Sequence, residues 1–99
     1  MPTSPNGGHP DPMPRYLIHR ALGDVTDDQL EAAAEMSTRV REERFPAIEW
    51  EHSHVVRTQD GLTSYCVYTA PSAHDVRDHA AAAGLPADEV LEIERDLLP

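Results

Sequence analysis

The dipeptide Asp60-Gly61 constrains the fold of this chain most, because it lies between two runs rich in β-branched and aromatic residues, at 48–58 and 62–70. Glycine readily adopts the positive φ that a tight hairpin turn requires, so Asp-Gly between such runs is a strong hairpin signal. We therefore expect two neighbouring antiparallel strands in the middle of the chain, and an all-helical fold is excluded.

A helix signal lies on each side of this hairpin. Thr26 is followed three residues later by Gln29, which is the pattern of a capping box, and the helical spacing after it ends before Pro46. Ser72 can cap a second helix, which Gly84 ends as a C-cap. Both helices are therefore expected to begin and end at defined residues.

Two further strand-like segments, residues 15–21 and 90–95, give the order strand, helix, strand, strand, helix, strand. In this order both crossovers are right-handed and place the two helices on one face of an antiparallel sheet. The sequence predicts an α+β ferredoxin-like βαββαβ sandwich. Because Trp50, Tyr65 or Tyr68, and the aliphatic residues cannot all lie beneath two helices, we expect a homodimer through the open sheet face, as in a dimeric α+β barrel.

The chain has 99 residues, the length of a single domain. Residues 1–14 are rich in proline and glycine, which remove amide donors and add backbone freedom, so we expect a flexible tail followed by one domain at residues 15–99. Met13 directly precedes the first predicted strand, and we hypothesise that it is the natural start of the protein.

The net charge of −10, from 18 acidic residues against 8 arginines, bounds the partners of the protein. A field of that sign repels phosphate backbones and attracts cations, so we expect no nucleic-acid partner. No apolar run approaches the roughly 20 residues of a membrane span, and no secretory signal is recognisable. We therefore expect a cytoplasmic protein without a membrane partner. Its single cysteine excludes an internal disulfide.

His52 and His54 lie two residues apart in the first hairpin strand, beside Trp50. Side chains on a strand alternate between faces, so both imidazoles project from the same face. Imidazole and thiolate are common ligands of borderline and soft transition metals. The two histidines are therefore candidate metal ligands, with Cys66 of the second hairpin strand as a third; the alternative is a pair of polar residues on an exposed face or a dimer seam.

The register of the hairpin decides whether Cys66 can join the histidines. A two-residue turn at Asp60-Gly61 places His54 opposite Val67, and Cys66 then faces the other side with Ser53. A three-residue turn with a bulge at Gly61 places His54 opposite Cys66, on the same face. The sequence permits both registers.

Histidines also occur on the second predicted helix. His79 lies four residues after Asp75, and His74 lies four residues before Asp78, so each pair shares a helix face. Such pairs can bind a divalent ion at a surface, or simply stabilise the helix. We include His79 as the fourth candidate ligand.

Several short segments in this order resemble the DUF4242 family of small ferredoxin-like proteins, over the chain from about Met13 onward. These segments are Arg15-Tyr16-Leu17-Ile18, Trp50-x-x-Ser53-x-Val55, Asp60-Gly61, Cys66-x-Tyr68-x-Ala70-Pro71, Val76-Arg77-x-His79-Ala80 and Gly84-Leu85-Pro86-Ala87-Asp88. The resemblance implies a dimer and, from a nickel-binding member, a capacity to bind nickel at the surface. His54 stands where that family leads us to expect tyrosine, and His19 where it leads us to expect glutamate.

We therefore expect a small metal-binding protein that sequesters or buffers nickel or a similar divalent ion, without an organic cofactor. The alternative is a cofactor-independent enzyme or ligand-binding module, with a pocket at the interface of a dimeric barrel lined by Tyr68, His52 and Trp50. This alternative rests on analogy of fold, and fold does not determine function. Because no Ser-His-Asp signature or phosphate-binding glycine loop is present, we favour binding over catalysis.

Overall fold

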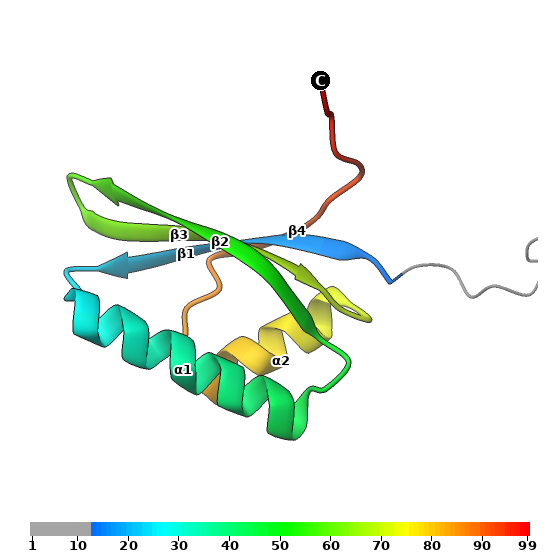
Figure 1. Cartoon of the computed structure of the whole chain (residues 1–99), viewed down its shortest axis with the longest axis horizontal. Coiled ribbons are helices and arrows are strands. Elements are labelled where there is room, and N and C mark those ends of the chain that lie inside the picture. Colours follow the sequence, from blue (N-terminus) through cyan, green and yellow to red (C-terminus); the bar gives the residue numbers. More distant parts are fainter. Residues whose placement is uncertain (1–12) are drawn as a thin grey trace, which may run out of the picture.

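The computed structural model describes residues 13–99 and has the predicted order of elements (Figure 1). They are β1 (Arg15–Gly23), α1 (Asp27–Arg44), β2 (Glu49–Thr58), β3 (Gly61–Thr69), α2 (Ala73–Ala83) and β4 (Glu89–Glu92). The strands form one antiparallel sheet in the order β2-β3-β1-β4, and both helices lie against the same face of it (Figure 1). The predicted ferredoxin-like fold is confirmed.

The N-terminal tail predicted at 1–14 lies outside the described residues, apart from Met13 and Pro14. The last strand, expected at 90–95, is shorter than predicted and ends at Glu92. No helix among the described residues is long and apolar enough to cross a membrane.

The predicted helix caps are present and fix where the helices begin and end. The Thr26 hydroxyl accepts a hydrogen bond from the Gln29 amide at 3.1 Å, and the Gln29 side chain accepts one from the Thr26 amide at 2.9 Å. The Ser72 hydroxyl accepts from the Asp75 amide at 3.2 Å. Gly84 ends α2 in the left-handed region, with φ 72. Each of the two N-caps, Thr26 and Ser72, stabilises its helix by about 1 kcal/mol.

The core lies between the sheet and the helices, and it is packed unevenly. Strand alternation turns Tyr16 and Ile18 of β1 toward the helices, where they pack with Val76 of α2. The longer helix, α1, contributes only Ser37 and Val40 as buried residues. Small side chains on the inner face of α1 therefore leave space between this helix and the sheet.

The register of the β2–β3 hairpin differs from both predicted alternatives. Thr58 pairs with Gly61, so the two-residue loop is Gln59-Asp60, one residue earlier than predicted. The Thr58 hydroxyl supports this turn by accepting from the Asp60 amide at 3.1 Å and donating to the Gly61 carbonyl at 3.2 Å. His54 consequently pairs with Tyr65, not with Val67 or Cys66.

Candidate functional site

His52 and His54 share the open face of the sheet, as the alternation of strand side chains predicts. Both side chains are exposed, and their ring centroids lie 5.2 Å apart with the ring planes at 72°. His52 pairs with Val67 and His54 with Tyr65 of β3. The two imidazoles therefore form an accessible pair of potential metal ligands.

A third imidazole lies on the same face. His19 of β1 pairs with Tyr65 on one side and with Glu89 of β4 on the other, so the register aligns His54, Tyr65, His19 and Glu89 in one row across the four strands. The His19 ring stacks on Tyr65 with centroids 5.3 Å apart, and its Nδ1 lies 3.8 Å from a Glu89 carboxylate oxygen. We call His19, His52 and His54 the open-face histidines.

The predicted ligand Cys66 lies on the other face of the sheet. It pairs with Ser53 of β2, whose side chain faces the helices, and it is buried in the core. Its thiol donates to the Ser64 hydroxyl at 3.6 Å. The two-residue length of the turn is the physical reason, and it agrees with the first of the two predicted alternatives. A three-residue turn with His54 opposite Cys66 would have placed all three side chains on one face.

The predicted ligand His79 is also far from the open face. Its side chain is fully buried, with 0% exposure, because α2 turns it toward α1 and the core. Nε2 lies 3.0 Å from the Ser37 carbonyl oxygen, to which it donates, while Nδ1 is buried without a hydrogen-bond partner. Burial lowers the pKa of His79 below its ordinary value and favours the neutral ring.

The four predicted ligands are thus divided between the two faces of the sheet, with His52 and His54 on one and Cys66 and His79 beneath the other. Within residues 13–99, no three His, Cys, Asp or Glu side chains lie close enough together to hold a metal ion. On the surface of α2, His74 contacts Asp78 at 3.1 Å, which is the helical pairing that the sequence predicted.

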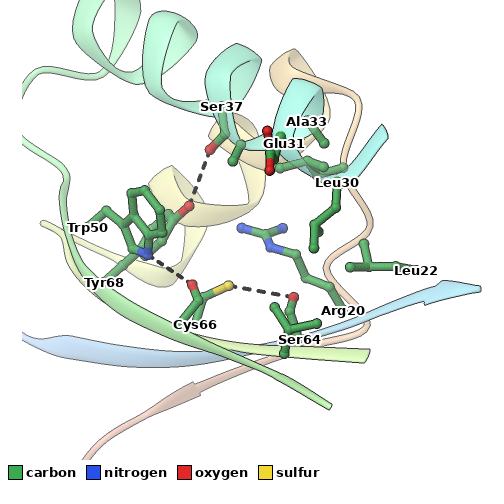
Figure 2. A pocket seen from close by; sticks show the side chains of 14 residues that line it. Arg20, Leu22, Leu30, Glu31, Ala33, Ser37, Trp50, Ser64, Cys66 and Tyr68 are labelled. Atoms are coloured by element: carbon green, nitrogen blue, oxygen red, sulfur yellow. Dashed lines mark hydrogen bonds between the residues drawn. The ribbon is translucent and has the colours of Figure 1, made fainter. Parts of the chain in front are cut away.

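A cavity of about 310 Å³ occupies the space between α1 and the helix-facing side of the sheet (Figure 2). Trp50 and Tyr68, two of the three residues predicted to line a pocket, lie in its wall. The third, His52, projects from the opposite face of β2. The expectation that Trp50 lies beside the two histidines is therefore wrong, because a register shift between Trp50 and His52 places these residues on opposite faces. This cavity lies under α1 within one chain, whereas the predicted pocket was placed at a dimer interface.

The walls of the cavity are mostly apolar. The Trp50 indole donates to the Ser53 hydroxyl at 2.9 Å, and the Tyr68 hydroxyl is hydrogen-bonded with Ser37 at 3.3 Å (Figure 2). Two charged side chains line it, Arg20 of β1 and Glu31 of α1. Sequence reasoning missed Arg20, although its place two residues after Ile18 on a strand predicts that it shares the core-facing side.

The family model described as "Nickel responsive protein SCO4226-like" matches residues 16–93 of the chain. The crystal structure of SCO4226 from Streptomyces coelicolor A3(2) is similar in fold, with a TM-score of 0.70 and 25% sequence identity; the alignment covers 84% of this chain and 99% of that chain. No curated protein shows a significant match. The region matched by the family model contains the open-face histidines and the cavity.

Proposed function

The chain belongs to the SCO4226-like family of nickel-responsive proteins, and from this membership we propose that it binds and sequesters nickel or a similar divalent ion. The observation that carries the proposal is the exposed pair of imidazoles at His52 and His54, since imidazole is a good ligand for nickel. The net charge of −10 favours approach of a cation. The similarity to the DUF4242 family is compatible with this assignment, and a cytoplasmic location belongs to the same proposal.

We assign His52 and His54 as the ligands. His19 lies on the same face, but Tyr65 separates it from His54, so it is not included. Cys66 and His79 are not included, because they lie beneath the sheet and are buried. Two imidazoles occupy only part of the coordination sphere of a divalent transition ion. The remaining positions would be filled by water, or by side chains of a second copy packed on the open face, in keeping with the homodimer that the sequence predicts.

The test is isothermal titration calorimetry with nickel at neutral pH, comparing the intact protein with a His52→Ala/His54→Ala variant. We expect the double substitution to weaken nickel binding at least about tenfold, a loss of about 1.4 kcal/mol. Binding to the intact protein should also weaken as the pH falls, because protonated imidazole cannot coordinate a metal.

A matched control separates this site from adventitious binding by other histidines. His74 is exposed on α2, away from the sheet, and His9 lies outside the described residues. A His9→Ala/His74→Ala variant should bind nickel as the intact protein does. If the His9→Ala/His74→Ala control loses its affinity for nickel while the His52→Ala/His54→Ala variant keeps it, the proposed site is wrong.

A further inference from the structure

Arg20 is a buried cation without an acidic partner in the described part of the chain. Its side chain projects from the middle of β1 into the core, and the residue is only 2% exposed. Nη1 donates to the Pro86 carbonyl oxygen at 2.6 Å, and Cζ lies 5.8 Å from the centre of the Tyr68 ring. Nη2 is buried without a hydrogen-bond partner, and no Asp or Glu side chain within residues 13–99 forms an ion pair with the group.

This arrangement is costly for the isolated protein. Burying a charge without a counter-charge is strongly unfavourable, and an apolar side chain of similar volume at such a position often gives an equally stable or more stable protein. One carbonyl and one aromatic ring compensate only part of that cost. A buried guanidinium with an unused donor therefore points to an anion that is bound in the functional state.

The Arg20 side chain that carries this unused donor lines the cavity beneath α1. Figure 2 shows the Arg20 guanidinium between the sheet and α1, with Ser64 and Tyr68 on the sheet side and Leu30 on the helix side. The hydroxyls of Ser64 and Tyr68 can donate to an oxyanion placed there. Most of the remaining wall is aliphatic or aromatic, and an apolar cavity with a few convergent polar groups is the usual form of a small-molecule site.

We propose that this cavity binds a small monocarboxylate with an apolar chain, and that Arg20 holds the carboxylate. Guanidinium pairs well with carboxylate because its planar donors match the carboxylate geometry. A monoanion fits the charge balance, because Arg20 is the cavity's cationic residue and its other charged wall residue, Glu31, repels a second negative charge. The apolar chain lies against the small side chains of α1, where Ala33 and Ala34 leave room for it.

Trp50 provides a direct readout of this site. It is the single tryptophan of the chain, it lines the cavity, and its indole is held by the hydrogen bond to Ser53. Titration of the full chain with sodium octanoate should therefore change Trp50 emission in a saturable manner. The uncharged 1-octanol should bind at least about tenfold more weakly, and octyl phosphate should bind no better than octanoate.

Replacement of the cation tests the assignment to Arg20. Arg20→Met keeps the apolar length of the side chain and removes a buried charge, so we expect it to fold, as circular dichroism and thermal unfolding would verify. The Arg20→Met substitution should weaken octanoate binding at least about tenfold and leave the affinity for 1-octanol unchanged. Equal affinity of the intact protein for octanoate and 1-octanol, or tighter binding of octyl phosphate, would overturn the proposal.

Two further variants keep the test decisive if Arg20→Met unfolds. Glu31→Gln removes the second charge from the cavity wall while leaving Arg20 in place, and it should tighten octanoate binding about two- to fivefold. Ala33→Phe fills the space beside α1 and should abolish the emission change with both ligands. The His52→Ala/His54→Ala variant should bind octanoate normally. Octanoate binding that survives Ala33→Phe would place the ligand elsewhere.

Discussion

Among the single residues, His79 is a titratable side chain that is fully buried in the core. It packs against the rings of Phe45 and Tyr68, with ring centroids 5.7 Å and 5.8 Å away. Burial is the main cause of its lowered pKa, and the positive charges of Arg20 and Arg41 lower it further, against the opposing effect of the Ser37 carbonyl. The folded state therefore holds a neutral imidazole, whereas the unfolded chain takes up a proton near pH 6.5.

We predict that the free energy of unfolding decreases as the pH falls below about 6.5, because the unfolded state then binds a proton that the folded state resists. Above that pH, His79 contributes no pH dependence. A His79→Gln variant, which keeps a donor for the Ser37 carbonyl, should show a flatter dependence between pH 7 and 5.5 in urea denaturation experiments. His74→Gln on the exposed side of α2 should retain the slope of the intact protein; equal slopes in all three proteins would contradict this account.

Single residues also show how far the sequence could predict the candidate site. Alternation alone correctly places His52 and His54 on one face, since it depends only on the strand period. The side of Cys66 depends on whether the turn has two or three residues, which the Asp-Gly signal leaves open. The turn has two residues, Gln59 and Asp60, and the Thr58 hydroxyl forms hydrogen bonds within it. His19 joins the open-face histidines only through the strand order, which brings β1 beside β3.

At the element scale, the boundaries of the two helices follow local chemistry and were predictable. The capping box at Thr26 and the left-handed Gly84 require only neighbouring residues, so the sequence contains the signal in full. The short β4 is different. It ends where pairing with β1 ends, at the Tyr16–Glu92 pair, and that limit is set by tertiary contacts that no local pattern records.

The amino-acid composition of α1 explains why a cavity lies between this helix and the sheet. A helix that presented large aliphatic side chains to the sheet would fill the space in which Arg20 lies. Apart from Leu30 and Glu31, the part of α1 that lines the cavity carries only the small side chains of Ala33, Ala34 and Ser37. Alanine has the highest helix propensity, so the helix remains stable without deep packing, and the cavity is compatible with a stable fold.

The β2–β3 turn is the element in which we expect a single substitution to destabilise the fold most. Gly61 is the residue that tests this expectation. Gly61 adopts φ 108, and a Cβ at this position would lie 2.4 Å from the backbone of Gly23. Gly61→Ala should therefore lower the free energy of unfolding by about 2 kcal/mol or more, because backbone strain and a steric clash add. The midpoint of urea denaturation measures this change.

Gly84→Ala is the matched comparison for this prediction. Gly84 also has a positive φ, 72, but a Cβ there meets no atom within 4 Å. The Gly84→Ala substitution should lower the free energy of unfolding by only about 1 kcal/mol, which is the cost of the left-handed conformation alone. A larger loss in Gly84→Ala than in Gly61→Ala would show that the contact with Gly23 does not determine the turn.

At the scale of the whole molecule, the sheet separates two chemical environments. The helix side holds the core and the cavity with the Arg20 guanidinium, whereas the open face holds the histidines and exposed apolar side chains. Val56, Tyr65 and Leu91 on that face are 43%, 39% and 51% exposed. The C-terminal segment extends from the sheet on the side away from the helices (Figure 1), and Asp96 is tied to Arg15 by an ion pair at 2.8 Å.

This apolar face is the surface through which we predict the homodimer, because contiguous exposed apolar area commonly marks an interface. Leu91→Arg introduces a charge on the open face of β4 and should convert the dimer to a monomer in sedimentation equilibrium. Met36→Arg places the same charge on an exposed position of α1 and should leave the dimer intact.

Because each chain carries a net charge of −10, dimer formation should also become more favourable as salt screens the repulsion between the two copies. A monomeric intact protein at tens of micromolar, or a Leu91→Arg variant that remains dimeric, would exclude the open face as the interface. The nickel site would then have to be completed by water and by side chains of one chain alone.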